Sequence, residues 1–199
     1  MFFGKKKTKA VYVAYMTKMM KYKGVIDKFQ QDTSSSKVLL LYYFEQTRDE
    51  MKALLKATGV SFQEISSGQS PGDGYILADA NGITESLFDQ VDSVYALEAH
   101  PIYSINNQPL SLAKGSPIKE ITWFTGMDEP VMAAFGSARI IKLMEQIGVN
   151  PEEEISHSMI STSIQKGQQK IEKSIPAPKD IRTSQEQWAE VNKLEKLNS

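Results

Sequence analysis

The chain contains no cysteine among its 199 residues and only two histidines. Without cysteine it can form neither a disulfide framework nor a thiolate metal site, and it has no cysteine nucleophile. The two histidines, His100 and His157, each lie near carboxylates in the sequence, but a metal site would need further ligands from elsewhere. Glu98 near His100 suggests acid–base chemistry, yet no Ser or Cys nucleophile motif accompanies it. We therefore expect no metal ion, no cofactor and no catalytic residue.

Long apolar runs are missing as well. No stretch approaches the roughly 18 to 20 apolar residues of a membrane-spanning helix, and the first residues contain no apolar run of the length that a signal peptide needs. The net charge is −1, from 23 basic and 24 acidic side chains, which argues against a general binder of polyanions such as nucleic acid. The composition predicts a soluble, cytoplasmic protein.

Positive charge is concentrated at the start of the chain, where Asp27 is the only acidic residue among the first thirty. With its apolar neighbours, this stretch could make peripheral contact with an anionic membrane surface. The alternative is a frayed basic terminus followed by a helix that packs on a sheet. The lysines concerned are Lys5, Lys6, Lys7, Lys9, Lys18, Lys21, Lys23 and Lys28.

Segments typical of strands and of helices alternate through the first two thirds of the chain. Residues 37–44 are apolar on consecutive positions, which is typical of a strand covered on both faces. The alternation, with short loops, predicts a three-layer α/β fold with a parallel sheet and right-handed crossovers. The expected strands are 10–15, 37–44, 60–65, 75–80, 93–98 and 117–125, and the expected helices are 16–31, 47–58 and 85–91.

The last third is predicted to be helical. We expect one helix over 132–147 that ends at Gly148, and a second over 156–174 that the prolines at 176 and 178 interrupt. A final amphipathic helix over 183–197 would dock on its own core or on a partner, and the sequence favours neither. The expected divisions are a basic terminus (1–9), an α/β domain (10–148), an exit helix (149–175), and a hinge with a last helix (176–199).

Three short patterns in the helical region fit one family. They are FGSARI at 135–140, LMEQIG at 143–148 and ISHSMISTSIQKGQQKIE at 155–172. Together they resemble, without a gap, the segment that leaves the second nucleotide-binding domain of SecA, the motor ATPase of bacterial preprotein export. Weaker similarity extends over 10–175, and implies a RecA-like domain. Matching positions upstream are Glu98, His100, Ile105, Asn107 and Gln108.

The departures from that family concern its arginines. In SecA the residues after the position of Gln108 carry arginines that reach the nucleotide phosphates, whereas 109–117 here (PLSLAKGSP) keeps only Lys114 as a cation. Lysine does not replace arginine in a bidentate phosphate contact. The loop 80–85 (ANGITE) also lacks the arginine of the family, and no GxxxxGK[S/T] motif occurs. The resemblance, with these departures, implies a degenerate, stand-alone motor domain that does not hydrolyse ATP by itself.

Two functions compete. The first is a non-catalytic interaction or regulatory module whose partner is SecA, the translocon or a second copy, because a RecA-like domain normally buries one edge against its twin. The second is a domain that binds a nucleotide or another small ligand without hydrolysis, in a cleft at the carboxyl ends of the strands. A genuine ATPase would need a P-loop in trans, which nothing in the sequence suggests. The cleft residues would be Asp79, Asn81, Gly82, Gln108 and Lys114.

Overall fold

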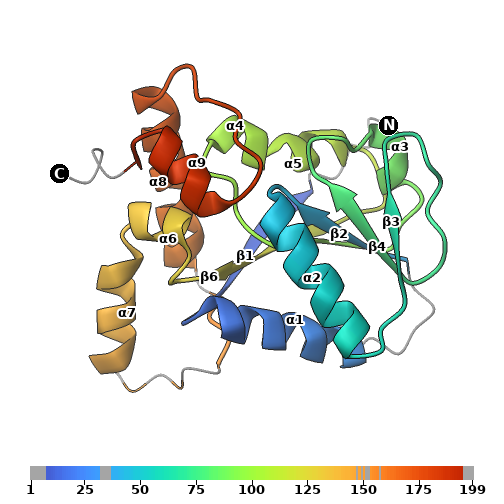
Figure 1. The fold of residues 1–199 in the computed structure, drawn as a ribbon, viewed down its shortest axis with the longest axis horizontal. Coiled ribbons are helices and arrows are strands. Elements are labelled where there is room, and N and C mark those ends of the chain that lie inside the picture. The colour runs from blue at the N-terminus through green and yellow to red at the C-terminus, as the bar shows by residue number, and fades with distance from the viewer. Residues whose placement is uncertain are drawn as a thin grey trace, which may run out of the picture.

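A single six-stranded sheet organises the chain (Figure 1). The computed structural model describes residues 8–31, 37–146, 148, 150, 153–156 and 158–194. The strand order is β1-β6-β5-β2-β4-β3, and every neighbouring pair is parallel. The strands are β1 (Lys9–Tyr15), β2 (Val38–Tyr42), β3 (Phe62–Ile65), β4 (Tyr75–Asp79), β5 (Ser93–Ala96) and β6 (Glu120–Gly126).

Strand β2 lies inside the sheet, and all five of its residues are buried. Leu39 and Leu41 face one apolar cluster, whereas Val38 and Leu40 face the other, as the two-residue period of a strand requires. This explains why residues 37–44 are apolar without alternation, since a strand between two helical layers has no solvent face. The prediction of an α/β fold with a parallel sheet is confirmed.

Helices cover both faces of the sheet. Apolar residues of α1 (Lys18–Gln31) and α2 (Glu45–Ala57) pack on one face, in the cluster that contains Leu40. The opposite face is covered by α3 (Glu85–Phe88) together with α6 (Pro130–Ala134), α8 (Ser158–Ser174) and α9 (Gln185–Val191). The short helices α4 (Tyr103–Asn106) and α5 (Gln108–Leu112) lie between β5 and β6 in the chain. Helix α3 ends three residues earlier than predicted.

The helical last third differs from the prediction at one glycine. Residues 132–147 do not form one helix but contribute to two, α6 (Pro130–Ala134) and α7 (Ser137–Gln146). Gly136 separates them with φ of +83°, a left-handed conformation in which glycine escapes the Cβ clash. The chain therefore turns where the apolar spacing alone indicates continuity.

Two later helices complete the fold. Helix α8 (Ser158–Ser174) lies against β1, and before it Ile155 forms an antiparallel bridge to Ala14 at the edge of the sheet. Helix α9 (Gln185–Val191) lies beside α6 and buries Trp188 on the body of the same chain (Figure 1). The choice between docking on its own core and docking on a partner is thus settled for the described part of this helix.

Candidate functional site

Because all six strands are parallel, their carboxyl ends lie together along one side of the sheet, where α/β proteins commonly bind ligands. We call this side the carboxyl edge. The turn from β2 into α2 lies at this edge, as do Asp79 at the end of β4 and Glu98 just after β5. Glu129 follows β6 and precedes α6. The edge thus carries three carboxylates, one at or just after the end of each of three successive strands, β4, β5 and β6.

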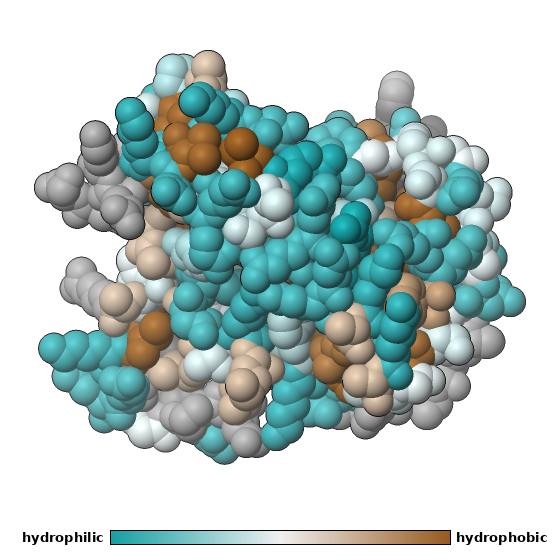
Figure 2. Space-filling model, viewed as in Figure 1, coloured by the Kyte–Doolittle hydropathy of each residue, from teal (hydrophilic) through white to brown (hydrophobic). Residues whose placement is uncertain are grey.

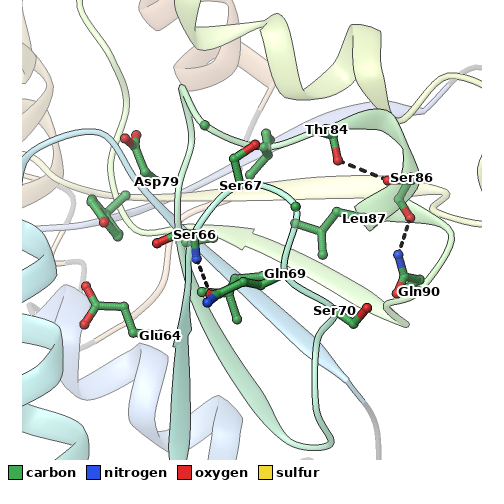
Figure 3. Close-up of a pocket in the computed structure, with 16 residues that line it drawn as sticks. Glu64, Ser66, Ser67, Gln69, Ser70, Asp79, Thr84, Ser86, Leu87 and Gln90 are labelled. Carbon is green, nitrogen blue, oxygen red and sulfur yellow. Dashed lines mark hydrogen bonds between the residues drawn. The ribbon is translucent and has the colours of Figure 1, made fainter.

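A pocket of about 460 Å³ opens at the ends of β3 and β4. Figure 3 shows Asp79 and Glu64 on one side of it and Thr84, Ser86 and Gln90 on the other. Some of the polar groups around the pocket are hydrogen-bonded to one another. The Gln90 side-chain amide donates to the Ser86 carbonyl, and the Ser66 backbone amide donates to the Gln69 side chain. None of the residues that line the pocket carries a positive charge. Its other hydroxyl and amide groups come from Ser66, Ser67, Gln69 and Ser70.

The structure places only two of the five predicted cleft residues at this pocket. Asp79 and Gly82 line it, whereas Asn81, Gln108 and Lys114 are not among its lining residues. Asn81 donates its backbone amide to Asp79 Oδ1 at 2.9 Å, an Asx-type turn. Gln108 begins α5 and Lys114 follows that helix, both with exposed side chains. The five residues therefore do not form one lining.

The cation at Asp79 comes from a distant part of the chain that no sequence pattern places there. Arg182 Nη2 lies 2.5 Å from Asp79 Oδ1, and both side chains are about one third exposed, at 33% and 27%. Burial lowers the pKa of Arg182, but the hydrogen bond and charge of Asp79 outweigh that effect and raise it. The acidic side chain at the end of β4 is thus neutralised from within the chain.

Glu98 organises the centre of the edge. It is fully buried and accepts from the amides of Tyr43 and Phe44 at 2.9 Å each. It also accepts from the Thr47 hydroxyl at 2.7 Å and from Gln185 Nε2 at 2.8 Å. A carboxylate with four donors is fixed in place, so this residue holds the β2–α2 turn and ties α9 to it.

A buried ion pair lies beside Glu98. Lys21 Nζ is 2.5 Å from Glu129 Oε1 and also donates to the Leu97 carbonyl at 2.8 Å, and the Glu129 side chain accepts from the Gly126 amide at 2.6 Å. Burial raises the pKa of Glu129, and Glu98 acts in the same direction, whereas Lys21 opposes both. The pair joins α1 to the β6–α6 turn and is structural in character.

His100 lies in an aromatic layer and does not approach a carboxylate. Its ring stacks on Phe44 at 5.7 Å and meets Trp188 edge-on at 5.9 Å. Its Nδ1 accepts from the Ile102 amide, and burial lowers its pKa to about 3, so the ring is neutral at pH 7. Its carbonyl accepts from Gln168, which connects the two segments that most resemble SecA. His157 lies outside the described residues.

The first amides of α2 are bonded to the C-terminal part of the chain. Glu45 donates to the Arg182 carbonyl at 2.8 Å, and Gln46 donates to the Thr183 carbonyl at 2.9 Å. The first amides of a helix have no partner within the helix and are a ready site for anions. Here two of them are occupied by the chain itself.

Other kinds of site are not found among the described residues. Across them, no group of three or more His, Asp or Glu side chains could hold a metal ion. Within the same part of the chain, every helix is too short or too polar to span a bilayer.

Several known proteins that are similar to this chain share one name. The chain is 26% identical over 184 residues to the protein translocase subunit SecA of Christiangramia forsetii, an alignment covering 81% of this chain and 16% of that protein. It is 25% identical over 182 residues to SecA of Pelodictyon phaeoclathratiforme, covering 80% and 18%, and 23% identical over 209 residues to SecA of Psychrobacter arcticus, covering 79% and 22%. No family model matches.

Among solved structures, the C-terminal part of the Fun30 ATPase domain superposes with a TM-score of 0.42 at 14% identity, over 78% of this chain and 54% of that one. The SecA alignments extend through most of the parallel sheet and its helices, and the chain spans only about a fifth of the length of those relatives. The chain is therefore a SecA-like domain with the RecA-type α/β fold.

Proposed function

We propose that this SecA-like domain is a protein-interaction module of preprotein translocation that does not hydrolyse ATP on its own. The link to translocation rests on the similarity to SecA over about 80% of the chain. The non-catalytic role rests on the carboxyl edge, where a motor domain would meet nucleotide.

The observation that carries the proposal is the occupancy of that edge by the chain's own groups. The amides of Glu45 and Gln46 bind carbonyls of the C-terminal segment, and the nearest cation to the end of β4, Arg182, is paired with Asp79. Phosphoryl transfer needs cations and free donors aimed at the phosphates. An edge with three carboxylates and few free donors supports a role without nucleotide chemistry.

The surface also supports a protein partner. Figure 2 shows a mostly hydrophilic face with several apolar patches, one of which lies near α8 and α9. Ile175 and Ile181, which flank the segment between these helices, are only partly buried. Apolar patches rimmed by polar residues are typical of interaction sites.

The test uses the purified chain with purified SecA and translocon vesicles from the same cell. Saturable binding to SecA or to the vesicles is expected, with a change of at least twofold in the rate of SecA-driven translocation. The chain alone should turn over no more ATP than a buffer blank, and Lys114→Ala should not change that result. Absence of binding to both components would contradict the proposal, and ATP turnover that Lys114→Ala abolishes would contradict the non-catalytic role.

A second candidate, the binding of a small ligand, is favoured by the hydroxyl-lined pocket at the ends of β3 and β4. With Glu64 and Asp79 in its wall and no cation lining it, the pocket suits a neutral polyhydroxylated molecule better than a nucleotide. A ligand that binds the folded state raises the melting temperature by mass action. A rise with millimolar sugars, lost in Ser86→Val, would favour this candidate, and a rise with ATP would favour the nucleotide version.

A further inference from the structure

The last described part of the chain, residues 176–194, forms what we call the C-terminal strap. It leaves α8 through Pro176 and Pro178, which have no amide hydrogen to donate, and it has no helix until Gln185. Most of the side chains from 176 to 183 are exposed or only partly buried. The strap is therefore attached to the body mainly through α9 and the residues next to it, and its last described residue, Leu194, is also buried in the core.

The attachments fall into two groups. Backbone carbonyls of Arg182 and Thr183 accept from the first amides of α2, which requires an extended chain but no particular side chain. Three side chains add recognition: Arg182 pairs with Asp79, Gln185 donates to Glu98, and Trp188 is 1% exposed against His100. This combination resembles the way that proteins bind peptides, with main-chain bonds for affinity and side-chain pockets for selectivity.

The body side of this contact is held by contacts of its own. Glu98 is fixed by the amides of Tyr43 and Phe44, and the Phe44 ring stacks on His100 to make the floor on which Trp188 lies. The Asp79 carboxylate at the carboxyl end of β4 is complementary in charge to an arginine. A site whose parts are ordered by the body can accept a segment of the right chemistry from elsewhere, because little further ordering is required.

We propose that this carboxyl edge is a docking site for a protein segment that contains an arginine and, six residues after it, a tryptophan. The strap occupies the site in cis as an exchangeable ligand. The inference deepens the proposed interaction role, because it names the chemistry that a partner would present. A tethered segment has an effective concentration of the order of millimolar. A partner segment therefore displaces the strap only if it binds more tightly or is held by additional contacts.

The direct test is trans binding of a labelled peptide with the sequence of residues 179–194. Its anisotropy is titrated with the full chain and with the full-chain variant Arg182→Ala, whose own strap is weakened. Binding to the variant should be about two- to fivefold tighter than to the unchanged chain, the factor that corresponds to a partly exposed ion pair. The peptide carrying Trp188→Ala should bind at least tenfold more weakly, and the peptide carrying Arg182→Ala about two- to fivefold more weakly. A Gln187→Ala peptide is the matched control, because that side chain is exposed.

Two results would overturn the proposal. One is the absence of peptide binding to the folded Arg182→Ala chain, and the other is equal binding of the Trp188→Ala and control peptides. If the variant chain does not fold, native-state hydrogen exchange of the unchanged chain decides. The amides of Glu45 and Gln46 should then exchange at least tenfold faster than those of Leu40 and Leu77, since strap opening exposes them without global unfolding. Equal protection would make the strap an inseparable part of the core.

The two experiments can give negative results independently of each other. Peptide binding tests the docking site, whereas binding to SecA or the translocon tests the proposed function. Peptide binding without any binding to SecA or the translocon would retain the docking site and remove its link to export. Binding to SecA that the peptide does not compete for would retain the interaction role and place the contact on another surface.

Discussion

Arg182 and Asp79 are separated by more than a hundred positions in the chain, yet their side chains meet at 2.5 Å at the carboxyl end of β4. Through this ion pair the C-terminal strap reaches the edge of the sheet at which parallel α/β proteins bind ligands. The same strap supplies the carbonyls that bind the first amides of α2. One segment thus neutralises the charge at this edge and covers its donors.

Loss of this pair should cost little stability, because both side chains are about one third exposed. We expect Arg182→Ala and Asp79→Asn each to lower the free energy of unfolding by about 0.5–1 kcal/mol, with smaller effects at high salt. Urea denaturation at low and high ionic strength measures this. A loss of several kcal/mol would show that the strap is integral to the core and would weaken the case for exchange.

Glu98 should matter far more for stability. Replacement by alanine leaves the buried amides of Tyr43 and Phe44 without an acceptor, so we expect a loss of about 2–4 kcal/mol. Glu98→Gln keeps one acceptor oxygen and should lose less than half as much. Equilibrium denaturation followed by circular dichroism compares the two variants. Equal losses would mean that the negative charge, and not the acceptor geometry, is what the turn requires.

The buried pair of Lys21 and Glu129 should behave as a coupled unit. Lys21→Met leaves Glu129 buried without its cation, which should cost about 3–5 kcal/mol. The double variant Lys21→Met/Glu129→Gln should recover at least half of that loss, because neither member of the pair then leaves an unpaired buried charge. A double-mutant cycle measures the coupling free energy. Additive losses would refute the coupling.

His100 should make the chain sensitive to acid. Its pKa is lowered by burial to about 3 from an ordinary value near 6.5. The unfolded chain therefore binds a proton as the pH falls below 6.5 while the folded chain does not. Its contribution to stability is full above that pH and is lost between about pH 6.5 and 3. By pH 4.5 the loss should be about 3 kcal/mol.

The measurement for His100 is urea denaturation at pH 7 and pH 4.5, compared with His100→Phe. The variant should be less stable at pH 7, because the Ile102 amide loses its acceptor. It should then lose about 2–3 kcal/mol less than the unchanged chain on acidification. An identical loss in both proteins would assign the acid sensitivity to carboxylates of lowered pKa. The first to test is Glu50, where burial raises the pKa but the hydrogen bonds from Lys18 and Tyr22 outweigh it and lower the pKa.

Several features of the fold follow from local sequence. Consecutive apolar residues at 37–44 identified a strand with no solvent face, and the alternation of strands and helices predicted the parallel sheet. The single helix expected over 132–147 was wrong, because the apolar spacing continues through Gly136 while its positive φ turns the chain. A glycine of that kind costs a helix only about 1 kcal/mol relative to alanine, so tertiary packing decides whether the helix ends there.

The candidate site was less predictable. Asp79 and Gly82 were assigned to the cleft because they lie at the carboxyl end of a predicted strand and just after it, and they do line the pocket. Gln108 and Lys114 were assigned by resemblance to a nucleotide cleft, and they do not line it. Nothing in the local sequence predicted a role for Arg182, because a single arginine after a proline-rich hinge is expected to be an exposed polar residue.

The sequence by itself determined the class of fold and the similarity to SecA, because strand and helix periodicity and the patterns FGSARI and ISHSMISTSIQKGQQKIE are local properties of the chain. Only the tertiary structure decided what occupies the carboxyl edge. Glu98, His100, Arg182 and Trp188 come together there through contacts between segments far apart in the chain. Such contacts depend on how the strap packs against the body, and local periodicity contains no information about that packing.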